Sequence, residues 1–269
     1  MPASRYVYVA RNNAAESENR IHSDDIARQH GFAGALVPGI ATFAHALTPV
    51  LRAYGTDWLT HGSVTLRYRK PVYVGQEITV DLVPGGDADE VTVTGPDGAV
   101  KASGQIRTVA SDADTAPPFP RTKPPAVPEP IDENMLLDLD WLGSVDIAAT
   151  EDACAEFRDG IGLAREDDVA ADFGFAHPGF LARTYADIMR ANLARTGPSI
   201  HAASEITYHR PVPLGTTLSL RGRLDRIFAR KGQRFWTMDL AWYDDDRLVM
   251  RAAHTSIYRL REPTESVPA

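Results

Sequence analysis

Three features that define large protein classes are missing or scarce in this sequence. Cys154 is the only cysteine, so no intrachain disulfide can form and a reducing compartment is expected. No apolar run approaches the length that spans a bilayer, and the opening stretch MPASRYVYVARNN lacks the apolar core of a signal peptide. We therefore expect a cytoplasmic protein that does not associate with a membrane.

Basic residues are in the minority, with 28 Lys and Arg against 36 Asp and Glu and a net charge of -8. A broad nucleic-acid footprint needs a basic face, so no nucleic-acid partner is expected. A local basic pocket for one small anionic ligand is compatible with the composition. The sequence contains no metal-ligand spacing, phosphate-binding glycine loop or serine-elbow motif, so neither a metal nor a cofactor is predicted.

The chain is long enough for two modest domains or one large one, with 269 residues of which 43% are hydrophobic. The segment TAPPFPRTKPPAVPEP, residues 115–130, is dense in proline, which lacks the N–H that helices and central strands require. It reads as an extended connector. The sequence thus predicts an N-terminal domain at residues 1–110, a linker at 111–133 and a C-terminal domain at 134–269.

The two parts resemble each other. HGSVTLRYRKPVYVGQEITV, residues 61–80, aligns without gaps with HAASEITYHRPVPLGTTLSL, residues 201–220, at a constant offset of 140 (His61 to His201). The same offset pairs VPG at 37–39 with HPG at 177–179, and DDIARQHGF upstream pairs with DDVAADFGF at an offset of 143. Three matches in the same order indicate an internal duplication.

Both halves carry the same pattern of elements. A short helix starts at Ser23, with Asp24 and Asp25 in its first turn and Gly31 after its end. Longer apolar helices are predicted at 39–54 and 179–195. Alternating or β-branched runs predict strands at 6–9, 63–69, 76–83, 90–94 and 100–109, and again at 204–209, 217–227, 234–243 and 248–259. This predicts an α+β fold, in which each half wraps an antiparallel sheet around a long central helix and the two sheets join.

The segment ENRIHSDDIARQHGF, the VPG turn and the strand pair at RYRKPVYVGQEITV resemble the MaoC-like, (R)-specific enoyl-CoA hydratases of the hotdog superfamily. The resemblance covers most of the first half, and the helix and strands of the second. Asn19, His22 and Gly39 match family positions. Ser17 stands where the family has its catalytic aspartate. Arg165 falls opposite His22, so the second half has no His loop, and the resemblance implies a tandem hotdog with at most one His site.

The resemblance also implies how these residues would act. His22 would orient or deprotonate water, and the N–H of Gly39, at the start of the central helix, would bind the thioester oxygen. Ser17 cannot act as a base at neutral pH without an activating partner, and Glu18 is a candidate to replace the missing carboxylate. The predicted catalytic set is His22, Ser17, Asn19, Glu18 and Gly39, and the predicted substrate-binding set is Val37, Pro38, Phe43, Arg67 and His61.

Three functions follow from this reading. The first is a hydratase or dehydratase acting on an enoyl thioester of coenzyme A or a carrier protein. The second is a hotdog thioesterase, which uses a carboxylate near the central helix; the predicted helix at 39–54 contains no Asp or Glu. The third is a catalytically degenerate module that binds an acyl or polyketide-like ligand. The expected partner is a small acyl thioester, and a homodimer of the whole chain is compatible with the duplication.

Overall fold

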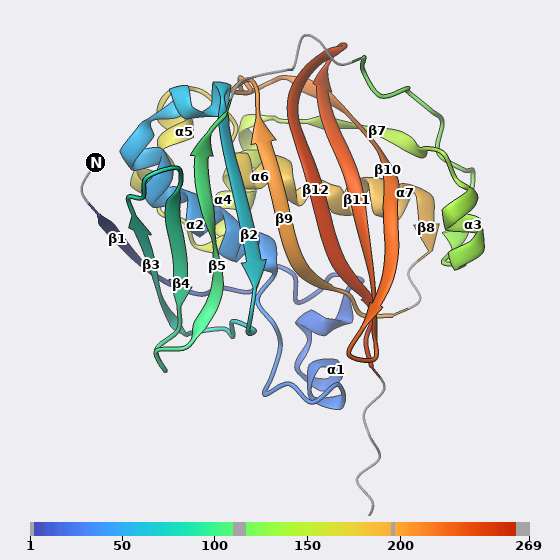
Figure 1. Cartoon of the computed structure of the whole chain (residues 1–269), viewed down its shortest axis with the longest axis horizontal. Coiled ribbons are helices and arrows are strands. Elements are labelled where there is room, and N and C mark those ends of the chain that lie inside the picture. The colour runs from blue at the N-terminus through green and yellow to red at the C-terminus, as the bar shows by residue number, and fades with distance from the viewer. Residues whose placement is uncertain (1–2, 110–116, 195–196, 262–269) are drawn as a thin grey trace, which may run out of the picture.

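The computed structural model describes residues 3–109, 117–194 and 197–261. Within them, a ten-stranded antiparallel sheet covers one side of a layer of helices (Figure 1). Its strands are β1 (Ser4–Val9), β2 (Gly62–Tyr68), β3 (Glu77–Val83), β4 (Asp89–Thr94), β5 (Val100–Thr108), β7 (Leu142–Ala148), β9 (Ile200–Tyr208), β10 (Thr217–Arg230), β11 (Gln233–Asp244) and β12 (Arg247–Arg259). The helices are α1 (Asp24–Gln29), α2 (Gly39–Tyr54), α3 (Glu133–Asp138), α4 (Glu151–Ile161), α5 (Val169–Asp172), α6 (Pro178–Arg183) and α7 (Tyr185–Asn192). The predicted α+β architecture is confirmed.

The order of strands shows the duplication directly. The sheet runs β1-β3-β4-β5-β2-β9-β12-β11-β10-β7, so equivalent strands lie at equal distances from its centre. At the centre, β2 pairs antiparallel with β9, and Thr65 lies opposite Glu205. These two residues differ by 140 in number, which is the offset of the sequence repeat. A two-fold relation between the halves therefore passes between them, and the two small sheets join into one.

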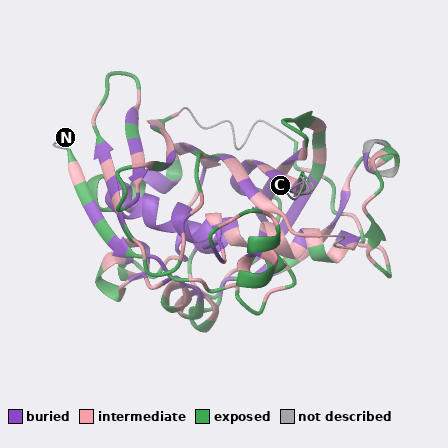
Figure 2. Cartoon of the chain, turned by 90° about the horizontal axis from the view of Figure 1, so that it is seen from below, coloured by how far each residue is buried: buried purple, intermediate pink, exposed green. Residues whose placement is uncertain are grey.

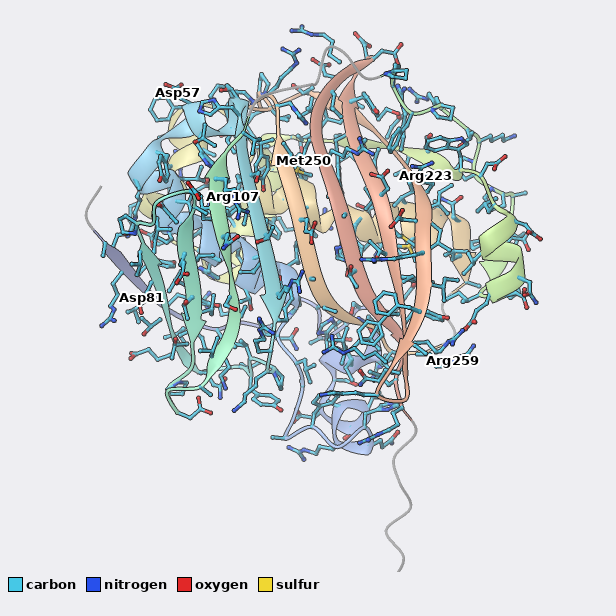
Figure 3. The ribbon with its side chains drawn as sticks, in the orientation of Figure 1. Asp57, Asp81, Arg107, Arg223, Met250 and Arg259 are labelled. Carbon is cyan, nitrogen blue, oxygen red and sulfur yellow. The ribbon has the colours of Figure 1, made fainter. Side chains whose placement is uncertain are left out.

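Helix α2 is buried on nearly all sides because its sequence is apolar on nearly all sides. Every residue from Ile40 to Leu51 is buried, and buried residues gather where the helices meet the sheet (Figure 2). The helix begins at Gly39 and ends at Tyr54, as the sequence predicts. On the opposite face of the sheet, strands carry charged side chains such as Asp81 and Arg223 toward solvent (Figure 3).

The equivalent helix of the second half departs from the prediction of one helix at 179–195. It is interrupted at Thr184, which separates α6 from α7, and residue 195 lies outside the described residues. The Thr184 hydroxyl donates to the carbonyl of Leu181 at 2.6 Å and accepts from the indole N–H of Trp242 at 2.8 Å. A hydroxyl that bonds backwards to its own helix competes with the regular pattern and favours a bend.

Several elements of the second half were not predicted, among them α3, β7 and α4. Strand β7 adds to the edge of the sheet beside β10, and helix α4 is capped by the Thr150 hydroxyl and ends at Gly162, whose φ of 74° is left-handed. The linker prediction stays partly open, since residues 110–116 lie outside the described part of the chain. Further along the linker, the N–H of Thr122 donates to the Ser144 hydroxyl and the Thr122 hydroxyl donates to the carbonyl of Leu142, both in β7.

The contact between α2 and α6 allows a test of packing. A Cβ on Gly179 would lie 2.6 Å from the Cβ of Ala44, far inside van der Waals contact. We expect Gly179→Ala to lower the free energy of unfolding by about 1–3 kcal/mol, because the helices would have to separate. In the matched variant Gly86→Ala the new methyl meets nothing within 4 Å, so the change should stay within about 0.5 kcal/mol. Denaturant unfolding measures both, and equal effects would contradict the packing argument.

Candidate functional site

The loop that carries His22 is held by a buried side chain and by hydrogen bonds to its backbone. Ile21 is fully buried, and its carbonyl accepts from the N–H of Leu36 at 3.2 Å. The Asn12 amide donates to the carbonyl of His22 at 2.8 Å. Asp24, at the start of α1, accepts from the N–H of Ala35 at 2.7 Å, in agreement with a structural role for this acid. The imidazole is therefore presented by a fixed backbone.

Hydrogen-bond partners define which nitrogen of His22 carries the proton. Nδ1 lies 2.7 Å from the carbonyl oxygen of Leu36, which can only accept, so Nδ1 donates. Nε2 lies 3.3 Å from the amide nitrogen of Asn19, which can only donate, so Nε2 accepts. The neutral ring thus keeps a lone pair on Nε2, the atom that could take a proton.

Asn19 is itself held by the second half of the chain. Its amide nitrogen donates to the carbonyl of Ser199 at 2.9 Å, and its oxygen accepts from the N–H of Ser199 at 2.9 Å. This pair of bonds permits one orientation of the amide, since a flipped amide would face both partners with the wrong atom. The protonation pattern of His22 therefore depends, through Asn19, on Ser199, which is 180 positions from Asn19.

The start of α2 is fixed by the same kind of contacts. The Tyr68 hydroxyl donates to the carbonyl of Gly39 at 2.6 Å, and the N–H of Val37 donates to the carbonyl of Val72 at 2.9 Å. A Cβ on Gly39 would lie 2.8 Å from the Cβ of His201. Glycine at this position thus makes room for His201, a contact that the sequence alone did not suggest.

A groove with a volume of about 780 Å³ passes these residues. It is lined by His22, Asn19, Gly39, Val37, Pro38 and Arg67 of the predicted set, together with Tyr68 and His201. Its basic lining residues are Arg67, Arg69, Lys70, Arg226, Arg230 and Lys231. Glu205 is the only carboxylate among the described lining residues, and it lies 3.9 Å from Arg67. The protein is acidic overall, so the cations are concentrated here.

The other predicted site residues lie elsewhere. Phe43, on α2, is fully buried in the core. His61 lies before β2, with its Nδ1 2.6 Å from the Thr60 hydroxyl. Neither residue lines the groove. The Ser17 hydroxyl donates to the carbonyl of Asn19 at 3.4 Å. Glu18 lines a second cavity and not the groove. The structure therefore does not bring Glu18 together with His22.

The second cavity, which we call the apolar chamber, has a volume of about 790 Å³. Its wall includes Ile131 of the linker, Met189 of helix α7, Leu193 directly after that helix, Trp236 of β11 and Tyr258 of β12. Both cavities fall in the size range of small-molecule sites. They share two lining residues, Tyr185 and Ser199, and so adjoin each other.

No family model and no curated protein matches the sequence, but solved structures resemble the whole chain. A MaoC domain protein dehydratase from Chloroflexus aurantiacus has a TM-score of 0.61 at 13% identity, with 96% of each chain covered. A Mycobacterium tuberculosis protein with a double hotdog fold has a TM-score of 0.57 at 12% identity, again with 96% of each chain covered. The chain has a double hotdog fold. The tesB protein of Mycobacterium avium subsp. paratuberculosis aligns with a TM-score of 0.54 at 14% identity, over 94% of this chain and 92% of that one.

The second hotdog offers no equivalent of the His22 loop. Arg165, the counterpart of His22, pairs with Asp172 at 2.7 Å. His177 caps α6 by accepting from the N–H of Gly179 at 3.0 Å. Trp58 packs against Tyr208, with ring centroids 5.3 Å apart, and occupies the space that a Cβ on Gly62 would need. The part of the second hotdog that corresponds to the His22 loop thus holds an ion pair in place of the histidine.

Sequence reasoning missed a buried cluster of aromatic rings between the groove and the apolar chamber. The ring of His254 stacks on Tyr185 at 3.8 Å and lies 4.3 Å from the ring of His201. Ser204 and Ser256 hydroxyls bond to Nε2 of His201 and His254, at 2.7 and 2.9 Å. The alternation of HTSIY on β12 places His254 and Ser256 on the inner face, and this was the available signal.

No cluster of three or more potential metal-binding side chains occurs within residues 3–109, 117–194 and 197–261. In the same ranges, no helix has the length and apolar character needed to cross a membrane.

The buried histidines predict how stability depends on pH. Burial lowers the pKa of His45 to about 4 and that of His201 to about 3, and it also lowers the pKa of His254. Their pKa values in the unfolded chain are near 6.5, so between about pH 6.5 and 4 the unfolded chain binds more protons. Stability is therefore fully present above pH 6.5 and falls as the pH drops, by up to about 1.4 kcal/mol per pH unit for each such histidine.

Denaturant unfolding at pH 7.5, 6.5 and 5.5 measures this dependence. In His45→Gln, which removes one titrating group, the fall between pH 6.5 and 5.5 should be smaller by up to about 1.4 kcal/mol. A profile that is flat over this range in the unmodified protein would show that the buried rings do not titrate as described.

Proposed function

We propose that the protein is a MaoC-like hydratase or dehydratase that adds water to, or removes it from, an enoyl thioester. The observation that supports this most directly is the neutral imidazole of His22, whose accepting Nε2 lines the same groove as the start of α2. A base for water and a helix N-terminus for an oxyanion are the two parts that the reaction requires. The double hotdog fold is shared by dehydratases and thioesterases, so it does not choose between these reactions.

In the hydration direction, Nε2 of His22 takes a proton from water while the oxygen bonds to the β-carbon. The electrons of the carbon–carbon double bond move toward the thioester, and the developing enolate oxygen is stabilised by the amide N–H and dipole at Gly39. The imidazolium then returns a proton to the α-carbon. One histidine completes the proton balance, so the reaction does not require the carboxylate that Ser17 replaces.

The basic lining of the groove supports a thioester whose carrier bears phosphates. Six cationic side chains line it, against one carboxylate that is already near Arg67. Phosphate oxygens are good acceptors for Arg and Lys. Coenzyme A and the phosphopantetheine of a carrier protein both carry phosphate at the end of the pantetheine arm that is remote from the thioester.

A thioesterase is the second candidate, because the fold is also that of an oleoyl thioesterase from Lactobacillus plantarum, at a TM-score of 0.53 and 12% identity over 97% of each chain. Helix α2 contains no Asp or Glu, and Glu205 is exposed and near Arg67, which leaves no evident carboxylate to direct water. A module that binds an acyl ligand without catalysis is the third candidate, favoured by Ser17.

Crotonyl-CoA distinguishes the three. Loss of enoyl absorbance without thiol release is expected for the hydratase, and thiol release would identify a thioesterase. His22→Gln should lower kcat/KM for hydration by roughly 10²–10⁴-fold, since it removes the base. Ser23→Ala, which changes the same loop without lining the groove, should stay within about twofold. Equal activity of His22→Gln and the unmodified protein would end the assignment of His22.

The basic lining generates a separate prediction. Arg230→Ala and Lys70→Ala should each raise KM for crotonyl-CoA by about twofold to fivefold and leave kcat unchanged, as expected for the loss of one exposed ion pair with phosphate. The N-acetylcysteamine thioester, which has no phosphate, should show no change. The matched control is Arg5→Ala. Arg5 lies on the distant strand β1 and forms an ion pair with Asp81 of β3. An equal rise for both thioesters would show that these cations do not contact phosphate.

A further inference from the structure

The apolar chamber has no part in the chemistry described above, although it adjoins the groove. The two cavities share Tyr185 and Ser199, and the backbone of Ser199 is the partner of Asn19. A ligand whose reacting end lies at His22 could therefore extend past Tyr185 into the chamber.

The chamber wall has the character of a site for a hydrocarbon group. Ile131, Met189, Leu193, Trp236 and Tyr258 present apolar surface. The charged lining residues, Glu18, Arg20 and Arg190, are exposed and therefore lie at its rim. A chamber of this kind gains free energy from apolar surface that it removes from water.

Part of the wall is supplied by the segment between the two hotdogs. Val127, Pro128 and Ile131 line the chamber, and strand β6 (Glu129–Pro130) pairs with β8 (Leu193–Ala194). Immediately beyond, Glu133 accepts hydrogen bonds from Arg234 of β11 and from Tyr258 of β12. The linker is thus held across the helix and the sheet, and it forms one wall of the chamber.

Tyr185 stands at the boundary between the two cavities. It is the first residue of α7, directly after the interruption at Thr184, and its ring stacks on the buried ring of His254 at 3.8 Å. The imidazole stacking restrains the phenol ring, which lies 6.1 Å from the ring of His201 in the groove. The Tyr185 side chain therefore lines both cavities, and a ligand that occupied both would contact it.

We propose that the apolar chamber binds the hydrocarbon part of the acyl group and that Tyr185 determines how much of that group enters. This inference rests on the proposed function, in that the thioester end is placed at His22. The substrate class is then an acyl thioester with an extended or bulky apolar tail, and short acyl groups use the groove alone.

Saturated acyl-CoAs of 4 to 12 carbons test the chamber without hydration, because they contain no double bond. Calorimetry should show binding that tightens by roughly threefold to fourfold per added methylene once the tail passes Tyr185. Fluorescence should change with the same dependence, since Trp236 lies in the wall, and Trp236→Phe should remove that change. If dodecanoyl-CoA binds no more tightly than butyryl-CoA, the chamber is not an acyl site.

Variants locate the effect. Met189→Trp fills the chamber and should abolish the dependence on tail length while leaving butyryl-CoA binding unchanged; Met189→Leu, of similar volume, should retain the dependence. Ala194→Phe fills the chamber from a different wall and gives the same test if Met189→Trp folds poorly. Tyr185→Ala should shift preference toward longer or branched tails relative to Tyr185→Phe. A dependence on length that survives both filling variants would overturn the proposal.

The two proposals can fail separately. Binding that tightens with tail length in a protein that does not hydrate crotonyl-CoA supports the chamber and rejects the hydratase. Hydration of crotonyl-CoA with no dependence of binding on tail length supports the hydratase and rejects the chamber.

Discussion

The two hydrogen bonds between the Asn19 amide and the backbone of Ser199 are the contact on which the candidate site depends. They join the two hotdogs at the groove, and by fixing the amide they leave its second N–H for Nε2 of His22. The carbonyl of Leu36 fixes the other nitrogen. The hydrogen bond to Nε2 of His22, in the first half, therefore depends through Asn19 on backbone of the second half, and neither half contains the complete arrangement.

The sheet explains how the halves come to share a site. Because β2 and β9 pair antiparallel about Thr65 and Glu205, the start of β9 lies beside the end of β2, near the N-terminus of α2. His201 reaches Gly39 for this reason, and its duplicate His61 lies at the opposite end of β2. The two-fold relation alone would give repeated residues equivalent surroundings, so the different contacts of His61 and His201 reflect divergence between the two halves.

The sequence predicted what is local or repeated. The bounds of α2, most strands and the duplication followed from apolar periodicity, turn residues and the constant offset between His61 and His201. The break at Thr184 could not be predicted, because the indole that bonds to its hydroxyl is 58 residues away. Tyr185, His254 and Ser199 were missed for the same reason, since their roles arise from contacts between distant strands and helices. Asn19 and His22 were found only because they resemble a known loop.

The interruption of the second central helix has a consequence for how such a fold can change. In a homodimer of single hotdogs, one gene encodes both central helices, so a break in one is a break in both, and the helix that begins at the groove would be broken too. Joining the copies in one polypeptide removes that linkage. The central helix of the copy without a histidine loop could then be interrupted while the other stayed continuous. The two halves of one chain can therefore differ in structure, which the identical subunits of a homodimer cannot.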